Sequence, residues 1–164
     1  MISEAAVLAN VMDKTRELTW MYLNLLKDTD MHKVYEVDGK KLNSAFWIMA
    51  HLSVTENFLL LRSTGGENVK IPWARQFGLG SVQVPEPECP PLADVKEVFS
   101  SVHAKAISHI ASLEDSFLDS DNLINFEFDG EKSVRAMIVH AIRHEAAHAG
   151  HLGWLCKLNG IKTI

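Results

Sequence analysis

The sequence predicts an all-α fold, a four-helix bundle whose helices run up, down, down and up. Apolar residues recur at helical spacing in four stretches of the 164-residue chain. Turn-forming residues separate these stretches, and the longest connection, residues 63–91, lies between the second and the third. So long a connection can return the chain to the same end of the bundle, which allows the second and third helices to run parallel. The length suits a single domain, residues 1–164, with one core.

The first helix is expected to be capped by Ser3 and to run to about Lys27. Its predicted inward stripe comprises Leu8, Met12, Thr15, Leu18, Thr19, Tyr22, Leu25 and Leu26. A polar segment, residues 28–41, follows this helix, and Asp38 with Gly39 gives the clearest turn signal in it.

The second helix is predicted from Asn43 to Leu61, with Asn43 or Ser44 as its cap, and it is strongly apolar. Glycine and proline are dense in the connection that follows, so this connection cannot form a long helix. We expect it to pack over one end of the bundle and to bury its large apolar side chains, Trp73, Phe77 and Leu79.

The third helix is predicted from Leu92 to about Phe117. The apolar residues in register along it are Val95, Val98, Phe99, Val102, Ala106, Ile110 and Leu113. His103 and His109 lie six positions apart on this helix and do not share a face, so we interpret them as solvated histidines.

The fourth helix is predicted to begin after Lys132 or Ser133 and to end at Leu158, before Asn159 and Gly160. The segment before it, residues 118–131, alternates weakly between apolar and polar residues. This pattern indicates an extended segment closed by a turn at Asp129 and Gly130.

Four histidines of the fourth helix share one face. His140, His144, His148 and His151 lie within twelve residues, and at about 100° per residue they point near ~0°, ~40°, ~80° and ~20°. Histidines four positions apart lie one turn above each other, close enough for both imidazoles to reach one divalent ion. His144 with His148, and His140 with His144, are such pairs.

A histidine pair alone holds a divalent ion weakly, so a third ligand has to come from elsewhere in the chain. The best candidate is His51, which lies in the strongly apolar second helix. Because a buried imidazole without a partner is unfavourable, His51 either bonds a neighbouring group or binds a metal ion.

The segment from His144 to His148 also fits a short zinc-protease pattern, in which Glu145 would be the general base. One protease class needs a downstream glutamate ligand, but none of the sixteen residues after His148 is Glu or Asp. The other class needs Gly and His where this chain has His151 and Trp154. We therefore interpret Glu145 as a carboxylate that supports the ligands or lies at the surface.

Composition excludes several classes of partner. The formal net charge is -5, and no basic patch or arm indicates nucleic-acid binding. No apolar run reaches the roughly twenty residues of a membrane-spanning helix. The start of the chain lacks the features of a signal peptide, and Cys89 and Cys156 are expected to be free thiols. We therefore expect a cytoplasmic protein with neither a nucleic-acid nor a membrane partner.

The chain resembles the DinB-like superfamily. The resemblance is carried by the histidine of the apolar second helix, by residues His144 to His151, and by the leucine-rich helix end that follows them. The resemblance covers the whole chain in helix order, length and the long second connection. It implies one divalent ion, usually zinc or nickel, held by His51, His144 and His148. His151 stands where many relatives have glutamine, which leaves it as a fourth ligand or a hydrogen-bond donor, and His140 is assigned a supporting role.

Some members of the family are thiol-dependent S-transferases or isomerases. Three imidazoles leave a coordination position open, and a divalent ion there can make a thiolate available near neutral pH. The leading hypothesis is thus an S-transferase that uses a low-molecular-weight thiol and a small-molecule substrate. A metal-dependent hydrolase and a non-enzymatic, metal-stabilised bundle that binds a small molecule or a partner helix are the alternatives. A homodimer is expected.

Overall fold

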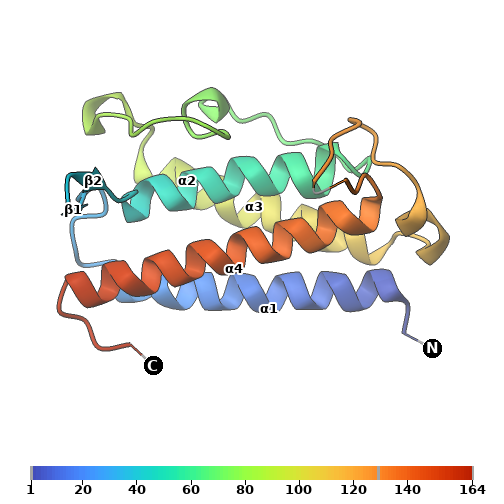
Figure 1. Cartoon of the computed structure of the whole chain (residues 1–164), viewed down its shortest axis with the longest axis horizontal. Coiled ribbons are helices and arrows are strands. Elements are labelled where there is room, and N and C mark those ends of the chain that lie inside the picture. Colours follow the sequence, from blue (N-terminus) through green and yellow to red (C-terminus); the bar gives the residue numbers. More distant parts are fainter. Residues whose placement is uncertain (1, 129, 164) are drawn as a thin grey trace.

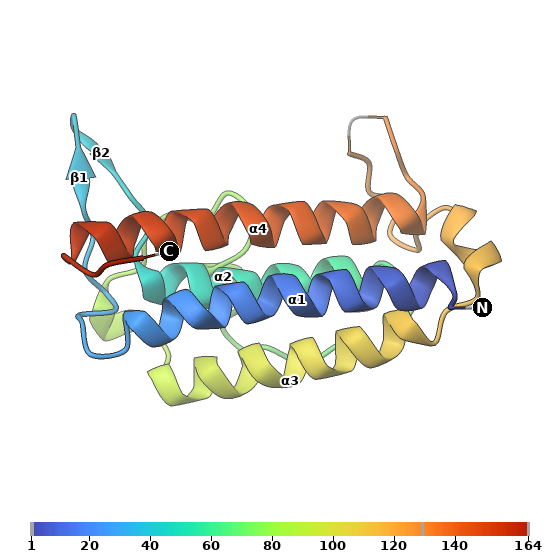
Figure 2. The ribbon, with the colours of Figure 1, turned by 90° about the horizontal axis from the view of Figure 1, so that it is seen from below.

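The four periodic stretches form the four helices of a bundle in the computed structural model, which describes residues 2–128 and 130–163 (Figure 1). The helices are α1 (Glu4–Leu25), α2 (Ala45–Glu56), α3 (Leu92–Ala111) and α4 (Val134–Leu158). Both α1 and α2 pack against α3 and α4. In Figures 1 and 2, α1 and α4 run in one direction and α2 and α3 in the other, so the predicted up-down-down-up bundle is confirmed. Within the described residues, no helix is long and apolar enough to cross a membrane.

The first helix begins where Ser3 predicts it, because the Ser3 hydroxyl accepts a hydrogen bond from the Ala6 amide at 3.2 Å. The carboxylate of Asp115 accepts from the amides of Glu4 and Ala5 at 3.0 Å each, which satisfies two more free N–H groups. The predicted inward stripe was wrong in part, since Leu18 and Leu25 are 36% and 40% exposed. The buried positions are Ala5, Ala9, Met12, Arg16, Thr19, Leu23 and Leu26. Because an arginine occupies the centre of this buried face, apolar periodicity alone could not identify the face.

A short hairpin follows α1. Strands β1 (Glu36–Val37) and β2 (Lys40–Lys41) pair antiparallel. The two residues between them, Asp38 and Gly39, both have positive φ, at 49° and 73°. This is the backbone of a two-residue hairpin turn that favours Asp-Gly. The predicted turn is therefore confirmed, and the strands on either side of it were not predicted.

The second apolar stretch is capped by Ser44 but is not one regular helix. After α2 the backbone widens into the π-helical segment η1 (Asn57–Arg62). The hydroxyls of Ser63 and Thr64 donate at 2.6 Å to the carbonyls of Leu59 and Leu60, four residues earlier. These bonds satisfy carbonyls at the widened end of the segment. The predicted α-helix to Leu61 is thus too long, because periodicity does not distinguish α from π geometry over a single turn.

The long connection, residues 63–91, runs back along α2 and contains the 3-10 turns η2 (Ala74–Gln76) and η3 (Glu86–Glu88) (Figure 1). It therefore covers a flank of the bundle rather than one end, because it must travel the length of α2 before α3 can start parallel to it. Trp73 and Phe77 are buried as predicted, at 9% and 0% exposure. The prediction for Leu79 was wrong, since this side chain is 84% exposed.

The third helix is shorter than predicted and ends at Ala111, before the 3-10 turn η4 (Asp115–Asp119). The interpretation of its histidines as solvated was wrong. His103 Nδ1 lies 2.7 Å from Glu56 Oε1, and His109 Nε2 lies 2.9 Å from the Thr64 hydroxyl. Their partners lie outside α3 and far away in sequence, so the spacing along α3 could not reveal them.

The segment predicted to be extended before α4, residues 118–131, is so only in part, because Leu118 and Asp119 belong to η4 and Asn125 has a positive φ of 51°. Asp121 pairs with Ser133 and Phe128 pairs with Glu131 in isolated β-bridges. Of the turn predicted at Asp129 and Gly130, Asp129 lies outside the described residues. The fourth helix has the predicted bounds, with Ser133 as its cap and a positive φ of 73° at Gly160.

Removing the cap of α4 is expected to lower stability. The Ser133 hydroxyl accepts from the Ala136 amide at 3.1 Å, and Ser133→Ala leaves that amide without its partner. We expect a loss of about 1 kcal/mol in the free energy of unfolding, measured by urea denaturation. Ser101→Ala, an exposed serine inside α3, is the control, and equal losses in the two variants would show that the cap does not stabilise α4.

Candidate metal centre

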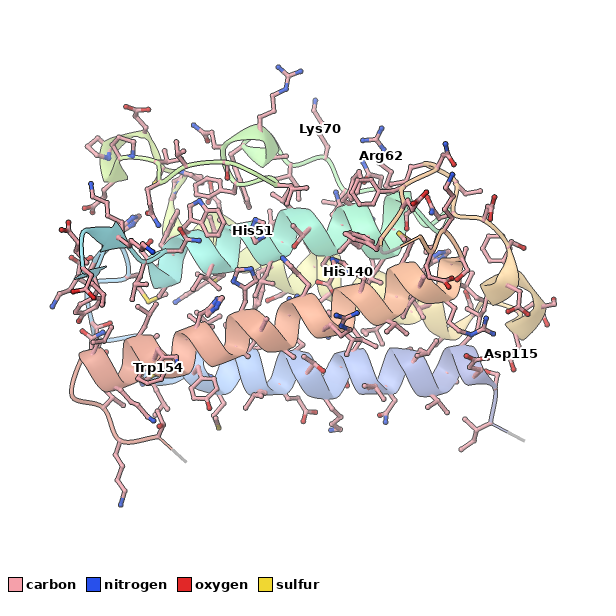
Figure 3. The ribbon with its side chains drawn as sticks, in the orientation of Figure 1. His51, Arg62, Lys70, Asp115, His140 and Trp154 are labelled. Atoms are coloured by element: carbon pink, nitrogen blue, oxygen red, sulfur yellow. The ribbon has the colours of Figure 1, made fainter. Side chains whose placement is uncertain are left out.

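The structure brings His51 of α2 together with His144 and His148 of α4. Each ring offers one nitrogen, and the three nitrogens lie within 4.8 Å of one another. His51 Nε2 lies 3.1 Å from His144 Nε2, and the ring centroids of His144 and His148 are 4.7 Å apart. His51 is labelled on α2 in Figure 3, where α4 runs next to α2, below it in this view. We call these three residues the histidine cluster.

The long connection fixes the orientation of His51. Its Nδ1 lies 2.7 Å from the main-chain carbonyl oxygen of Phe77. A carbonyl can only accept, so Nδ1 carries the hydrogen and donates it. The lone pair is then on Nε2, the nitrogen that faces His144. A hydrogen bond from the other ring nitrogen to a carbonyl is the arrangement typical of metal-binding histidines.

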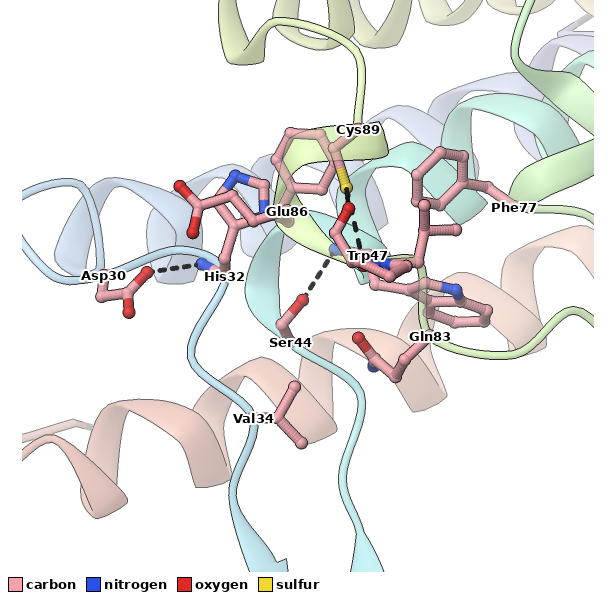
Figure 4. Close-up of a pocket in the computed structure, with 12 residues that line it drawn as sticks. Asp30, His32, Val34, Ser44, Trp47, Phe77, Gln83, Glu86 and Cys89 are labelled. Carbon is pink, nitrogen blue, oxygen red and sulfur yellow. Dashed lines mark hydrogen bonds between the residues drawn. The ribbon is translucent and has the colours of Figure 1, made fainter.

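Trp47, one turn before His51, supports the same ring from the side. The two ring centroids are 4.5 Å apart and the planes differ by 14°, so the rings are stacked. Ser44 holds this turn of α2 because its hydroxyl accepts from the Trp47 amide at 3.2 Å (Figure 4). The cavity drawn in Figure 4 has a volume of about 300 Å³, and both Trp47 and Phe77 line it. The helix cap, the stacked indole and the carbonyl together leave His51 little freedom to rotate.

The cluster is electrically neutral near pH 7. Burial, and then the neighbouring histidines, lower the pKa of His144 to about 4 and that of His148 to about 3. Burial also lowers the pKa of His51, against the opposing effect of its bond to Phe77. Neutral imidazoles keep the lone pairs that a cation needs. The donor set therefore fits one divalent ion of intermediate softness, with at least one coordination position left open.

The other two histidines of this face lie beside the cluster. The His151 and His148 Nδ1 atoms are 3.4 Å apart, which makes His151 a hydrogen-bond partner of a cluster residue. The ring of His140 stacks on Phe128 at 3.4 Å, and its centroid is 6.1 Å from that of His144. Of the predicted histidine face, His144 and His148 thus join His51, and His140 and His151 flank them.

Glu145 was predicted to support the ligands or to lie at the surface, but it is buried and its carboxylate bonds Arg16 rather than a cluster histidine. Both its oxygens bond Arg16 of α1, with Nε to Oε1 at 2.5 Å and a terminal nitrogen to Oε2 at 2.7 Å. Arg16 also donates to Glu56 at 2.7 Å and to the Phe99 carbonyl at 3.0 Å. Burial lowers the pKa of Arg16, but the two carboxylates outweigh burial and raise it above its usual value. A glutamate held in this way cannot serve as the general base of a zinc protease.

Two cavities reach the histidine face of α4. The first, which we call the hairpin cavity, has a volume of about 550 Å³, and its walls include Lys41, Asn43, His151 and Trp154. The second, which we call the phenylalanine cavity, has a volume of about 230 Å³ and is lined by His140 and His144. Phe58, Phe126 and Phe128 form its aromatic wall. Small molecules therefore have room beside His144 of the cluster and beside its neighbour His151.

The comparison with known families agrees with the geometry. A family model described as the DinB superfamily matches residues 12–152, a segment that includes all three residues of the histidine cluster. No curated protein matches the chain. Since the matched segment covers most of the sequence and the structure is a four-helix bundle, the chain belongs to the DinB superfamily.

Proposed function

We propose that this protein is a divalent-metal-dependent S-transferase that uses a low-molecular-weight thiol. The observation that supports this proposal is the convergence of three neutral imidazoles from α2 and α4, with one cavity lined by His144 and another lined by His151, which contacts His148. A zinc or nickel ion held by His51, His144 and His148 would supply Lewis acidity, which lowers the pKa of a thiol placed next to it.

The chain's own groups prepare the site for this chemistry. The Phe77 carbonyl and the Trp47 ring hold His51 in place, and His151 contacts His148 on the side of the hairpin cavity. In the reaction, the thiol gives its proton to solvent and its sulfur bonds an electrophilic carbon. The leaving group departs with the electron pair of the bond that breaks.

We assign the thiol to the hairpin cavity. Its volume of about 550 Å³ is within the range of small-molecule sites. Lys41 and Asn43 line it, and an ammonium and an amide are groups that can bind the carboxylate that small biological thiols commonly carry. Trp154, which is 63% exposed and labelled in Figure 3, offers an apolar face to the rest of the molecule.

The experiment is a panel of low-molecular-weight thiols with 1-chloro-2,4-dinitrobenzene and related electrophiles, tested on metal-loaded protein. We expect thiol consumption with at least one pair, and its loss in His144→Ala. If the loaded protein contains one metal ion per chain and consumes no thiol, S-transfer is wrong. Hydrolysis of an ester panel would then favour a hydrolase, and no turnover at all would favour a non-enzymatic binding protein.

A further inference from the structure

The phenylalanine cavity opens directly beside one member of the histidine cluster. Its aromatic wall is a chain of edge-to-face contacts, with centroids 5.6 Å apart for Phe58 and Phe126 and 4.7 Å apart for Phe126 and Phe128. The His140 ring stacks on Phe128 and continues this wall toward His144. The cavity therefore runs from an apolar interior to an imidazole of the proposed metal centre.

The lining of this cavity disfavours a charged occupant. Its described walls contain no Lys, Arg, Asp or Glu side chain. The hydroxyl of Thr55, which also lines it, bonds the main-chain carbonyls of His51 and Leu52 at 2.9 and 3.3 Å. An ionised group placed among the phenylalanine rings, away from His144, would lose its hydration without gaining a protein partner of opposite charge, which is strongly unfavourable.

The volume limits the size of the occupant. An apolar cavity of about 150 Å³ is large enough to bind benzene. At about 230 Å³, the phenylalanine cavity has room for one six-membered ring or a short branched alkyl group. The hairpin cavity has more than twice this volume and carries Lys41 and Asn43, so the two cavities select different molecules.

We propose that the phenylalanine cavity binds the apolar group of the electrophilic substrate, and that this group is a single uncharged ring or a branched alkyl chain. The reacting carbon then lies at the His144 side of the cavity, toward the thiol. That the occupant is the electrophilic substrate rests on the proposed S-transferase function. That the occupant is apolar and uncharged rests on the cavity alone.

The long connection offers a matched pair of variants. Leu79 lines the cavity and is 84% exposed, so a substitution there changes the mouth of the cavity without disturbing the core. Val82 lies three residues later, is 80% exposed, and is not part of the lining. Leu79→Asp places a carboxylate at the mouth, and Val82→Asp places the same charge on the same connection but outside the cavity.

The test is a titration of metal-free protein with 4-fluorobenzyl alcohol, followed by fluorine NMR. We expect saturable binding, with nuclear Overhauser contacts to the rings of Phe58 and Phe126. Leu79→Asp should weaken binding by at least about fivefold, because it removes apolar contact and adds a charge, whereas Val82→Asp should leave it unchanged. No saturable binding, or equal losses in the two variants, would overturn the assignment of this cavity.

This outcome is separable from that of the proposed function, because the titration needs neither metal nor turnover. Binding as described, without thiol consumption in any pair, would reject S-transfer and leave an apolar small-molecule site. Thiol consumption without binding of the probe would reject the cavity assignment alone.

Discussion

Replacement of Arg16 by methionine is expected to lower the free energy of unfolding by about 3–5 kcal/mol, the cost of removing one partner from a buried ion pair. Arg16 is 1% exposed and lies between Glu56 and Glu145, which are 3% and 1% exposed. Without the guanidinium, the two carboxylates remain buried with no cation between them. Guanidinium chloride denaturation followed by circular dichroism measures the loss.

Arg135 provides the matched control, because it pairs with Glu4 and Asp119 at the surface. Arg135→Met should cost far less, since water screens exposed ion pairs. A triple variant, Arg16→Met with Glu56→Gln and Glu145→Gln, should recover part of the loss because it removes the uncompensated charges. If Arg16→Met is no more destabilising than Arg135→Met, the buried ion pairs do not hold α1 against α2 and α4.

Replacement of His144 by alanine is expected to lower the affinity for zinc or nickel by more than about 100-fold. Removing a group that only hydrogen-bonds a metal ligand already costs up to about 100-fold, and His144 is itself a proposed ligand. The remaining imidazoles, those of His51 and His148, would form a two-nitrogen site, which holds a divalent ion weakly. Competition with a chelator of known affinity measures the change in the metal-loaded protein.

His32→Gln is the control for this variant. His32 stacks on Phe46 with ring centroids 4.2 Å apart and does not belong to the histidine cluster. The His32→Gln variant also lacks one imidazole and should keep the metal affinity of the unmodified protein. Equal affinities in His144→Ala and the unmodified protein would place the metal elsewhere.

The helices and the histidine cluster could be predicted because their signals are local or periodic. Ser3, Ser44 and Ser133 cap helices through amides three residues ahead, so sequence separation alone identifies them. The four-residue spacing of His144 and His148 fixes their common face on any regular helix. His51 was identifiable because a histidine in an apolar helix needs a partner.

The rest of the site depends on contacts between segments that are distant in sequence. Arg16 and Glu145 are 129 positions apart in the sequence. The one sign of their contact in the sequence is that Arg16, a charged residue, lies on the otherwise apolar face of α1. The group that orients His51 is a main-chain carbonyl, that of Phe77, and every residue has one. Proline and glycine predicted the long connection, but no side chain marks the point where it bonds the cluster.

The central claim is that imidazoles from α2 and α4 hold one divalent ion, and the X-ray absorption spectrum of zinc-loaded protein tests it most directly. The structure predicts one zinc per chain with three imidazole nitrogens at about 2.0–2.1 Å. A variant with His51, His144 and His148 replaced by alanine should retain no such ion. Bound zinc with the same spectrum and stoichiometry in that variant would contradict the claim.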